Sequence, residues 1–391
     1  MRERRTWKNV GLPFLVLRLA GQGGEFAAFV VLARQLDTDD FGRLSIAFLI
    51  ARYFGLVADW GASVRGTRDV ARGDDAGKID ALLRRRTQVS IVLTGAFAVG
   101  AWALIGPALV PLAVLVLARG LNRDWLALGR ERGWASGIAS LVQGIALLAF
   151  APLARTASAA AGALAVAYVV GLAVSLILNR RPTPADREKS SDTVPVDGWI
   201  LGALLADQIT ISADTLLLGL LRSSSAAGVY AAVYRIPGAW MTVIGLVVFG
   251  TLATTTRLVS GGTKEESRAV QRRSVGVGLL TAGAILVSAF PAYVLVPTVF
   301  GPAYSSGRTP LLILMVATAV MAITASMHPL YVALAQDRDV FTLSLSGALV
   351  NLVANSIAIP LGGLAGAASA TLVAQLALLG FVLARLRRLL L

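Results

Sequence analysis

Charged and amide side chains interrupt the long apolar stretches of this sequence at helical spacing. Arg18, Gln22 and Glu25 follow one another at i, i+4 and i+7, so a helix would carry all three on one face. A charge at the centre of a membrane helix costs about 2.5–3.5 kcal/mol on insertion scales, so such residues usually face a polar interior or pair with one another. Arginine forks suit phosphate through bidentate, charge-assisted hydrogen bonds. The pattern predicts an anion-binding, water-filled interior.

Similar polar faces occur further along the chain. Arg52 and Asp59 are seven residues apart, and so are Asp207 and Asp214. The candidate substrate-binding residues are Arg18, Arg52, Arg235, Gln22, Asn351 and Asn355. The candidate ion-coupling acids, for H⁺ or Na⁺, are Glu25, Asp207 and Asp214.

A second interpretation stays open for the same residues. Arg18 with Glu25, and Arg235 with Asp207 or Asp214, would neutralise each other and fasten helices together. Individual residues do not distinguish a polar cavity from such internal pairs.

Several other kinds of chemistry find little support. The sequence has no cysteine and one histidine, His328, so we expect no disulfide, no metal site and no cofactor. There is no GxxxxGK[ST] loop for a nucleoside triphosphate. Asp37 and Asp39 form a DxD motif that a membrane glycosyltransferase or ligase would use, but a turn at a helix boundary explains it better. We therefore expect no enzyme.

The elements that must position these residues are membrane helices. Of the 391 residues, 56% are hydrophobic and only 15% are charged, against about a quarter charged in soluble domains. A membrane helix needs about 20 apolar residues. Twelve apolar spans are predicted: 11–32, 41–61, 89–104, 108–121, 134–153, 159–178, 199–221, 227–252, 275–294, 311–334, 341–360 and 362–383.

The distribution of basic residues supports this count. With the N-terminus inside, 28 of the 36 Lys and Arg residues fall on inner segments and adjoining helix ends, and five fall on outer ones. This is the positive-inside bias of a multi-pass protein of the cytoplasmic membrane with both termini cytoplasmic. It also explains the net charge of +14 without nucleic acid as a partner. Joining the third and fourth spans would reverse the later loops, so we keep them separate at Gly106-Pro107.

Residues 179–198 form the longest polar break and divide the chain into two halves. We predict an N-terminal six-helix lobe at 1–180, a cytoplasmic linker at 181–197 and a C-terminal six-helix lobe at 198–391. A weak repeat at an offset of 186 residues supports this division; it relates Gln22, Gly42, Ile50 and Val57 to Gln208, Gly228, Ile236 and Val243. Paired halves around a central cavity suit alternating access.

Several segments resemble a known family. Val30–Arg72 contains Ala33-Arg34-Gln35-Leu36, then Phe41-Gly42, then Asp59-Trp60-Gly61, and it resembles the opening of Wzx-type polysaccharide transporters (oligosaccharide flippases) of the multidrug/oligosaccharidyl-lipid/polysaccharide export superfamily. Further loose matches are Arg123–Arg132, Asp214–Ile236, Phe300–Tyr304 and Asn351–Thr371. Leu36-Asp37 departs from the Leu-Gly usual in the family.

The resemblance implies two six-helix lobes that open alternately to each side of the membrane. It implies a polyprenyl-pyrophosphate-linked oligosaccharide as cargo, flipped to the outer leaflet, with the lipid bilayer and polysaccharide polymerase machinery as partners. An ion-coupled small-molecule or drug antiporter of the same superfamily is the alternative.

Overall fold

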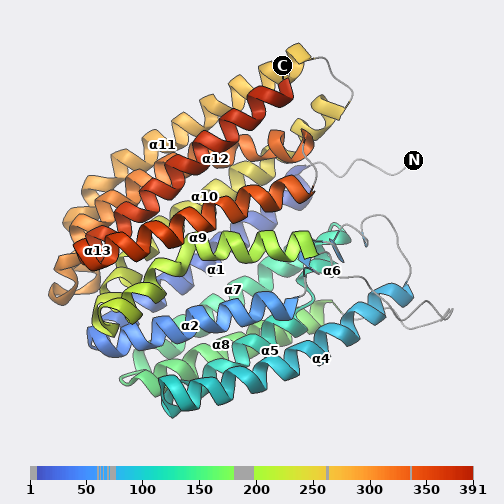
Figure 1. Cartoon of the computed structure of the whole chain (residues 1–391). Coiled ribbons are helices and arrows are strands. Elements are labelled where there is room, and N and C mark those ends of the chain that lie inside the picture. Colours follow the sequence, from blue (N-terminus) through green and yellow to red (C-terminus); the bar gives the residue numbers. More distant parts are fainter. Residues whose placement is uncertain are drawn as a thin grey trace. The chain divides into compact units, whose positions relative to one another are not determined.

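The computed structural model describes residues 7–59, 61, 63–64, 66–67, 70, 76–179, 198–260, 264–334 and 337–390, and within them the chain is helical and contains no strand (Figure 1). The α-helices are α1 (Trp7–Gln35), α2 (Thr38–Asp59), α4 (Ala76–Gly100), α5 (Ala113–Leu121), α6 (Asp124–Gly129), α7 (Gly133–Phe150), α8 (Ala157–Leu178), α9 (Gly198–Leu221), α10 (Ser224–Ser260), α11 (Lys264–Phe300), α12 (Arg308–Leu334) and α13 (Asp337–Leu390). The short helices are η1 (Ala101–Ile105), η2 (Pro107–Leu112), η3 (Ala151–Leu153) and η4 (Pro302–Gly307).

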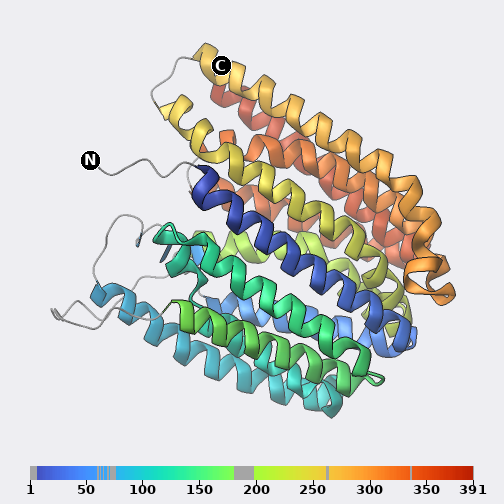
Figure 2. The same cartoon turned by 180° about the vertical axis from the view of Figure 1, so that it is seen from behind.

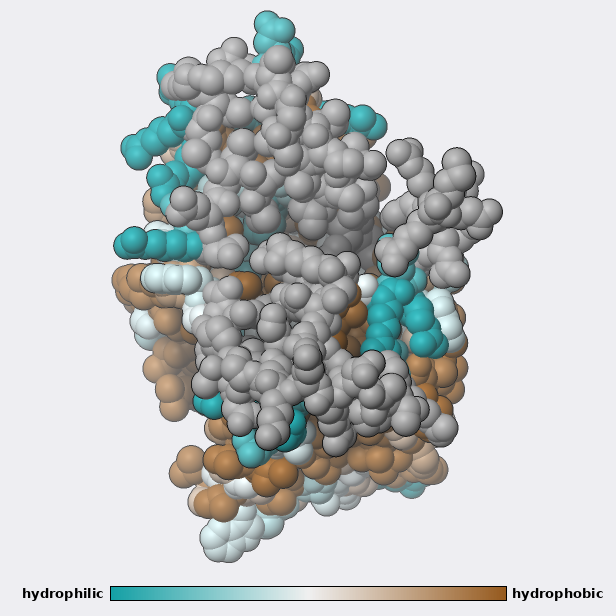
Figure 3. All heavy atoms as spheres, turned by 90° about the vertical axis from the view of Figure 1, so that its right-hand side faces the viewer, coloured by the Kyte–Doolittle hydropathy of each residue, from teal (hydrophilic) through white to brown (hydrophobic). Residues whose placement is uncertain are grey.

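The helices present apolar side chains to their surroundings. Among the described residues, nine helical segments are long and apolar enough to cross a membrane. Large hydrophobic side chains stand in the open, such as Leu104, Leu280 and Leu361, which are 87%, 78% and 82% exposed. On the face drawn in Figure 3, much of the described surface is hydrophobic. Such a surface suits lipid and not water.

The predicted all-α membrane fold with twelve helices is confirmed. The last two predicted spans form the single element α13, which bends at Gly363, where φ is 54° and ψ is −126°. The fourth predicted span is built from η2 and α5 together, and the eighth lies in α10. Several helices extend beyond their apolar spans because polar segments continue them; α11, for example, begins at Lys264 instead of residue 275.

The predicted separation of the third and fourth helices at Gly106-Pro107 is also confirmed. Gly106 has φ of 128°, a value that side chains rarely adopt, and Pro107 follows at the start of η2. The chain reverses here, so that α4 and α5 pack against each other. The short fourth helix is completed by the 3₁₀ turns of η2.

The chain divides into two compact units. Unit 1 comprises residues 1–36 and 43–201, and unit 2 comprises residues 37–42 and 202–391. In unit 1, α7 packs between α1 and α8, as Figure 2 shows from behind. In unit 2, α12 packs against α10, α11 and α13. The predicted linker at 181–197 lies outside the described residues.

The internal repeat has a structural counterpart. The first helices of the two halves end at Gln35 and Leu221, and the second helices begin at Thr38 and Ser224, so both boundaries are 186 residues apart. Gly42 and Gly228, which the repeat relates, lie against each other within unit 2. A Cβ on Gly42 would collide with the backbone oxygen of Ser224, and one on Gly228 would collide with that of Thr38. Glycine is required at both positions for this symmetric approach.

Each unit also holds the end of its first helix in a similar way. In unit 1, Gln35 Nε2 donates to the backbone oxygen of Pro152 at 2.9 Å, just after α7. In unit 2, Arg222 donates to the backbone oxygens of Ile359 (3.0 and 3.1 Å) and Pro360 (2.6 Å), just before the bend in α13. Carbonyls at helix ends lack intrahelical partners, so a long polar side chain satisfies them in both units.

Candidate binding site and buried polar networks

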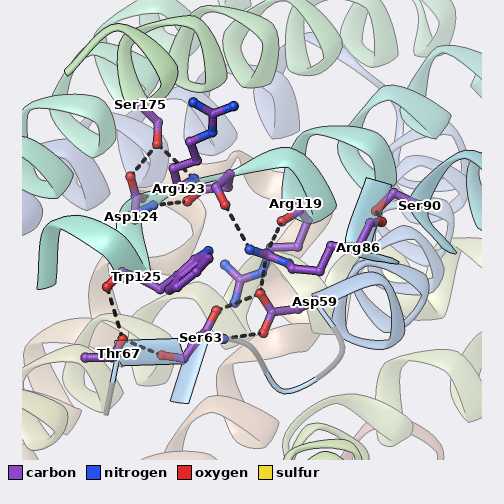
Figure 4. A network of polar contacts seen from close by, with 11 residues as sticks. Asp59, Ser63, Thr67, Arg86, Ser90, Arg119, Arg123, Asp124, Trp125 and Ser175 are labelled. Atoms are coloured by element: carbon purple, nitrogen blue, oxygen red, sulfur yellow. Dashed lines mark hydrogen bonds and ion pairs between the residues drawn. The ribbon is translucent and has the colours of Figure 1, made fainter. Parts of the chain in front are cut away.

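A buried ion pair organises one end of unit 1 (Figure 4). Arg86 Nη2 lies 2.7 Å from Asp59 Oδ1, and the two side chains are 1% and 2% exposed. Arg86 also donates to the backbone oxygens of Asn122 (3.1 Å) and Arg119 (3.2 Å). One guanidinium of α4 thus neutralises an acid at the end of α2 and satisfies two carbonyls at the end of α5.

Other polar side chains extend this network to neighbouring elements. Ser63 donates to Asp59 through its hydroxyl at 2.7 Å and its backbone N–H at 3.1 Å. The Ser175 hydroxyl of α8 donates to Asp124 Oδ1 of α6 at 2.7 Å. The network therefore ties α2, α4, α5, α6 and α8 together at one end of the unit.

Arg86 was missed as a functional candidate, although a signal was present. In the run Arg84-Arg85-Arg86, only Arg86 is buried, and the other two are exposed. Leu82, Arg86 and Ser90 succeed one another at spacings of four, and all three are buried. The helical period of the apolar face therefore extends through Arg86. Asp59 was placed correctly near the end of its helix.

Arg18 is exposed on the apolar helix α1. Its guanidinium carbon lies 5.5 Å from the centre of the Phe14 ring, a cation–π contact. Within the described part of the chain Arg18 forms no ion pair, so the neutralising pair with Glu25 considered above is wrong. Its position follows from the tight packing of α1 on α7, where a Cβ on Gly137 would lie 2.9 Å from Leu17 Cβ.

The remaining candidates of unit 1 share helices α1 and α2 with Arg18. Gln22 and Glu25 are partly buried, and the Gln22 Oε1 atom has no hydrogen-bond partner among the described residues. Arg52 is exposed on α2 and has a polar or ring contact of its own. The structure thus brings Arg18, Gln22, Glu25 and Arg52 into one unit.

In unit 2, Asp214 of α9 is fully buried in a hydroxyl network. Its Oδ2 accepts hydrogen bonds from the hydroxyls of Tyr230 on α10, at 2.6 Å, and Thr371 on α13, at 3.1 Å. Its Oδ1 accepts from the backbone N–H of Thr215 at 2.8 Å. The carboxyl group links three helices. Tyr230, expected as an anchor at the membrane interface, is instead 0% exposed because its hydroxyl meets this acid.

Asp207 has a different environment from Asp214. It is exposed on α9, and its polar neighbours are Ser344 of α13 and His328 of α12. Arg235 is partly buried in α10 of the same unit. Neither aspartate forms an ion pair with Arg235 in the described structure, so that pairing is wrong too.

Asn351 and Asn355 are fully buried on α13. Asn355 Nδ2 donates to Asn351 at both its backbone oxygen (3.0 Å) and its Oδ1 (3.1 Å). Among the described residues, Asn351 Nδ2 and Asn355 Oδ1 have no hydrogen-bond partner. The pair therefore keeps one free donor and one free acceptor inside unit 2.

The DxD motif has a structural role at its first residue. Asp37 Oδ1 accepts a hydrogen bond from the backbone N–H of Asp40 at 2.7 Å, directly before α2. This is the arrangement of a helix cap, which supports the interpretation as a helix boundary.

The geometry defines a multi-pass membrane protein with two helical units and polar groups inside them. The sequence model of a family described as polysaccharide biosynthesis protein matches residues 134–307. No curated protein matches this sequence.

Several solved structures share the fold. One is an inward-facing multidrug resistance transporter of the MATE family of the MOP superfamily, with 12% identity and a TM-score of 0.74 over 95% of this chain and 98% of that chain. An outward-facing conformation of such a transporter gives 13%, 0.67, 99% and 97%. The lipid II flippase MurJ, in an inward closed conformation, gives 10%, 0.65, 97% and 87%. The chain has the fold of MOP-superfamily transporters, and the predicted resemblance to that superfamily is confirmed.

Proposed function

We propose that this protein is a flippase that moves a polyprenyl-pyrophosphate-linked oligosaccharide across the cytoplasmic membrane for polysaccharide export. The observation that carries the proposal is Arg18, an exposed guanidinium without an ion pair on an apolar membrane helix. An uncompensated cation there is unfavourable unless it binds an anion during function. A pyrophosphate supplies that anion, and the family match at 134–307 points to polysaccharide biosynthesis.

The other candidates have supporting roles in this proposal. Arg52 and Arg235 add positive charge for the pyrophosphate, and Gln22 offers an oxygen without a partner. Asn351 and Asn355 supply polar groups inside unit 2. The exposed apolar surface tolerates the lipid tail of the cargo.

Alternating access is the proposed mechanism. Two structures with this fold are described as inward-facing and outward-facing conformations, which supports a cycle between two such states. A coupling ion, H⁺ or Na⁺, would bind an acidic side chain. Among Glu25, Asp207 and Asp214, Asp207 is the exposed one and has a histidine beside it. Membrane potential alone is a second possible drive.

The proposal also includes topology and partners. The basic segments place both termini and the linker at 181–197 in the cytoplasm. Polysaccharide polymerase machinery would use the flipped cargo on the outer face.

Replacement of three arginines tests the proposal in cells. We expect that Arg18, Arg52 and Arg235, changed together to Ala, will abolish export of the glycan while the protein still inserts in the membrane. The matched control changes three other exposed arginines to Ala, namely Arg84, Arg155 and Arg387. Normal glycan display by the first triple variant, at equal protein level, would remove the pyrophosphate-binding idea.

A drug antiporter is the second candidate, because several structures with this fold are described as multidrug transporters. Such a protein would expel organic cations in exchange for an ion and would not need Arg18. Ion-driven efflux of an organic cation from vesicles, unchanged by Arg18→Gln, would favour this function.

A further inference from the structure

Arg119 and Arg18 lie within electrostatic reach of each other in unit 1. Arg119 is in the last turn of α5, and the two guanidinium groups repel one another. Both residues are exposed, although they sit on apolar helices. Within the described residues neither guanidinium forms an ion pair or donates a hydrogen bond.

The acids near these two arginines are already engaged. Asp59 is paired with Arg86 at 2.7 Å. Asp124 accepts hydrogen bonds from Ser175 at 2.7 Å and from Asn122 Nδ2 at 3.1 Å. Positive charge therefore remains uncompensated between α1 and the end of α5.

The buried network fixes the place from which Arg119 projects. Arg86 donates to the backbone oxygen of Arg119 itself, at 3.2 Å, and to that of Asn122 at 3.1 Å. The stem of Arg119 lies against α2 at Gly55, where an added Cβ would lie 3.2 Å from Arg119 Cβ and Cγ. The end of α5 is thus held by a side chain that is itself 1% exposed.

We infer that Arg18 and Arg119 form a two-armed site for the diphosphate group of the cargo, and that the Asp59–Arg86 pair positions Arg119. The inference rests on the proposed function and names a binding residue that sequence reasoning counted only as an inner-loop charge. Two guanidinium groups match the two phosphates of a diphosphate. Bound diphosphate also relieves the repulsion between the two cations.

Binding of inorganic pyrophosphate to the purified full-length protein in detergent tests the site. Calorimetry should show that Arg18→Gln and Arg119→Gln each weaken pyrophosphate affinity at least tenfold. The control, Arg155→Gln, removes an exposed arginine beyond the opposite end of α7, about 27 Å along that helix, and should change affinity less than twofold.

A double-mutant cycle separates positioning from general stabilisation. Arg86→Lys keeps the charge next to Asp59 but cannot reach both carbonyls as the planar fork does. We expect it to weaken pyrophosphate affinity severalfold in the wild-type background and to have no further effect when Arg119 is already Gln. Equal effects in both backgrounds would overturn the positioning role of Arg86.

The outcomes separate this inference from the proposed function. Loss of affinity in Arg18→Gln with normal affinity in Arg119→Gln would overturn the two-armed site and leave the flippase proposal standing. A wild-type protein that binds no pyrophosphate would overturn both. Because Arg119 is exposed, Arg119→Gln should keep the wild-type melting temperature, which confirms that its lost affinity is not lost folding.

Discussion

Asp59 and Arg86, 27 residues apart in the sequence, form an ion pair of 2.7 Å in which both side chains are almost completely buried. The pair joins α2 to α4, and the same arginine holds the end of α5. This relationship sets the geometry of the polar end of unit 1.

The first prediction concerns this pair. Asp59→Ala should lower the free energy of unfolding by about 3–5 kcal/mol, because it leaves a buried guanidinium without its counter-ion. Thermal or denaturant unfolding in detergent measures the change. The control is the exposed pair Arg385–Asp339, whose side chains are 46% and 37% exposed. There Asp339→Ala should change stability by about 0–1 kcal/mol. Equal losses at the two sites would contradict the assignment.

Two tyrosines of unit 2 should respond in opposite ways to loss of a hydroxyl. Tyr230→Phe removes a 2.6 Å hydrogen bond to buried Asp214 and should destabilise the protein by about 1–3 kcal/mol. The Tyr304 hydroxyl is buried and has no hydrogen-bond partner among the described residues, so Tyr304→Phe should be neutral or stabilising. Unfolding of both variants under the same conditions is the measurement. A larger loss from Tyr304→Phe would show that the Asp214 network is wrongly described.

Two glycines of α10 provide a third comparison. Gly228→Ala places a methyl group against the backbone oxygen of Thr38 and should destabilise the protein, because neither backbone can move away without shifting a helix. Gly238 has open space around it, so Gly238→Ala should stabilise by up to about 1 kcal/mol through helix propensity. If melting temperatures show no difference between the variants, the close approach of Gly42 and Gly228 is not a feature of the protein.

Arg222 provides a fourth prediction, at the bend of α13. Arg222→Ala removes the donor for the backbone oxygens of Ile359 and Pro360 and should cost about 1–3 kcal/mol. Hydrogen exchange should then rise selectively around residues 357–366. Unchanged exchange in that segment would mean that the bend is held by other contacts.

The sequence predicts the helices well and the polar networks poorly, for physical reasons. A membrane span depends on local hydrophobicity, so even the break at Gly106-Pro107 follows from the residues nearby. Charged pairs depend on which helices meet. Arg18 and Glu25 share a helix face but do not pair, whereas Asp59 pairs with Arg86 of the next long helix.

The contrast within α4 shows why charge counting alone is insufficient. Arg84, Arg85 and Arg86 all agree with an inner loop end, and burial alone distinguishes the third. The helical spacing of Leu82, Arg86 and Ser90 was the available clue. No comparable pattern identifies Arg119, since its relevance comes from the proximity of α1.

The most direct test of the central claim is translocation of a fluorescent polyprenyl-pyrophosphate-linked oligosaccharide across the membrane of vesicles that contain the purified protein. We predict that the wild-type protein exposes the sugar to an enzyme or lectin on the opposite side, and that Arg18→Gln does not. Vesicles in which the wild-type protein leaves the labelled lipid on its original side, while it expels organic cations, would contradict the account.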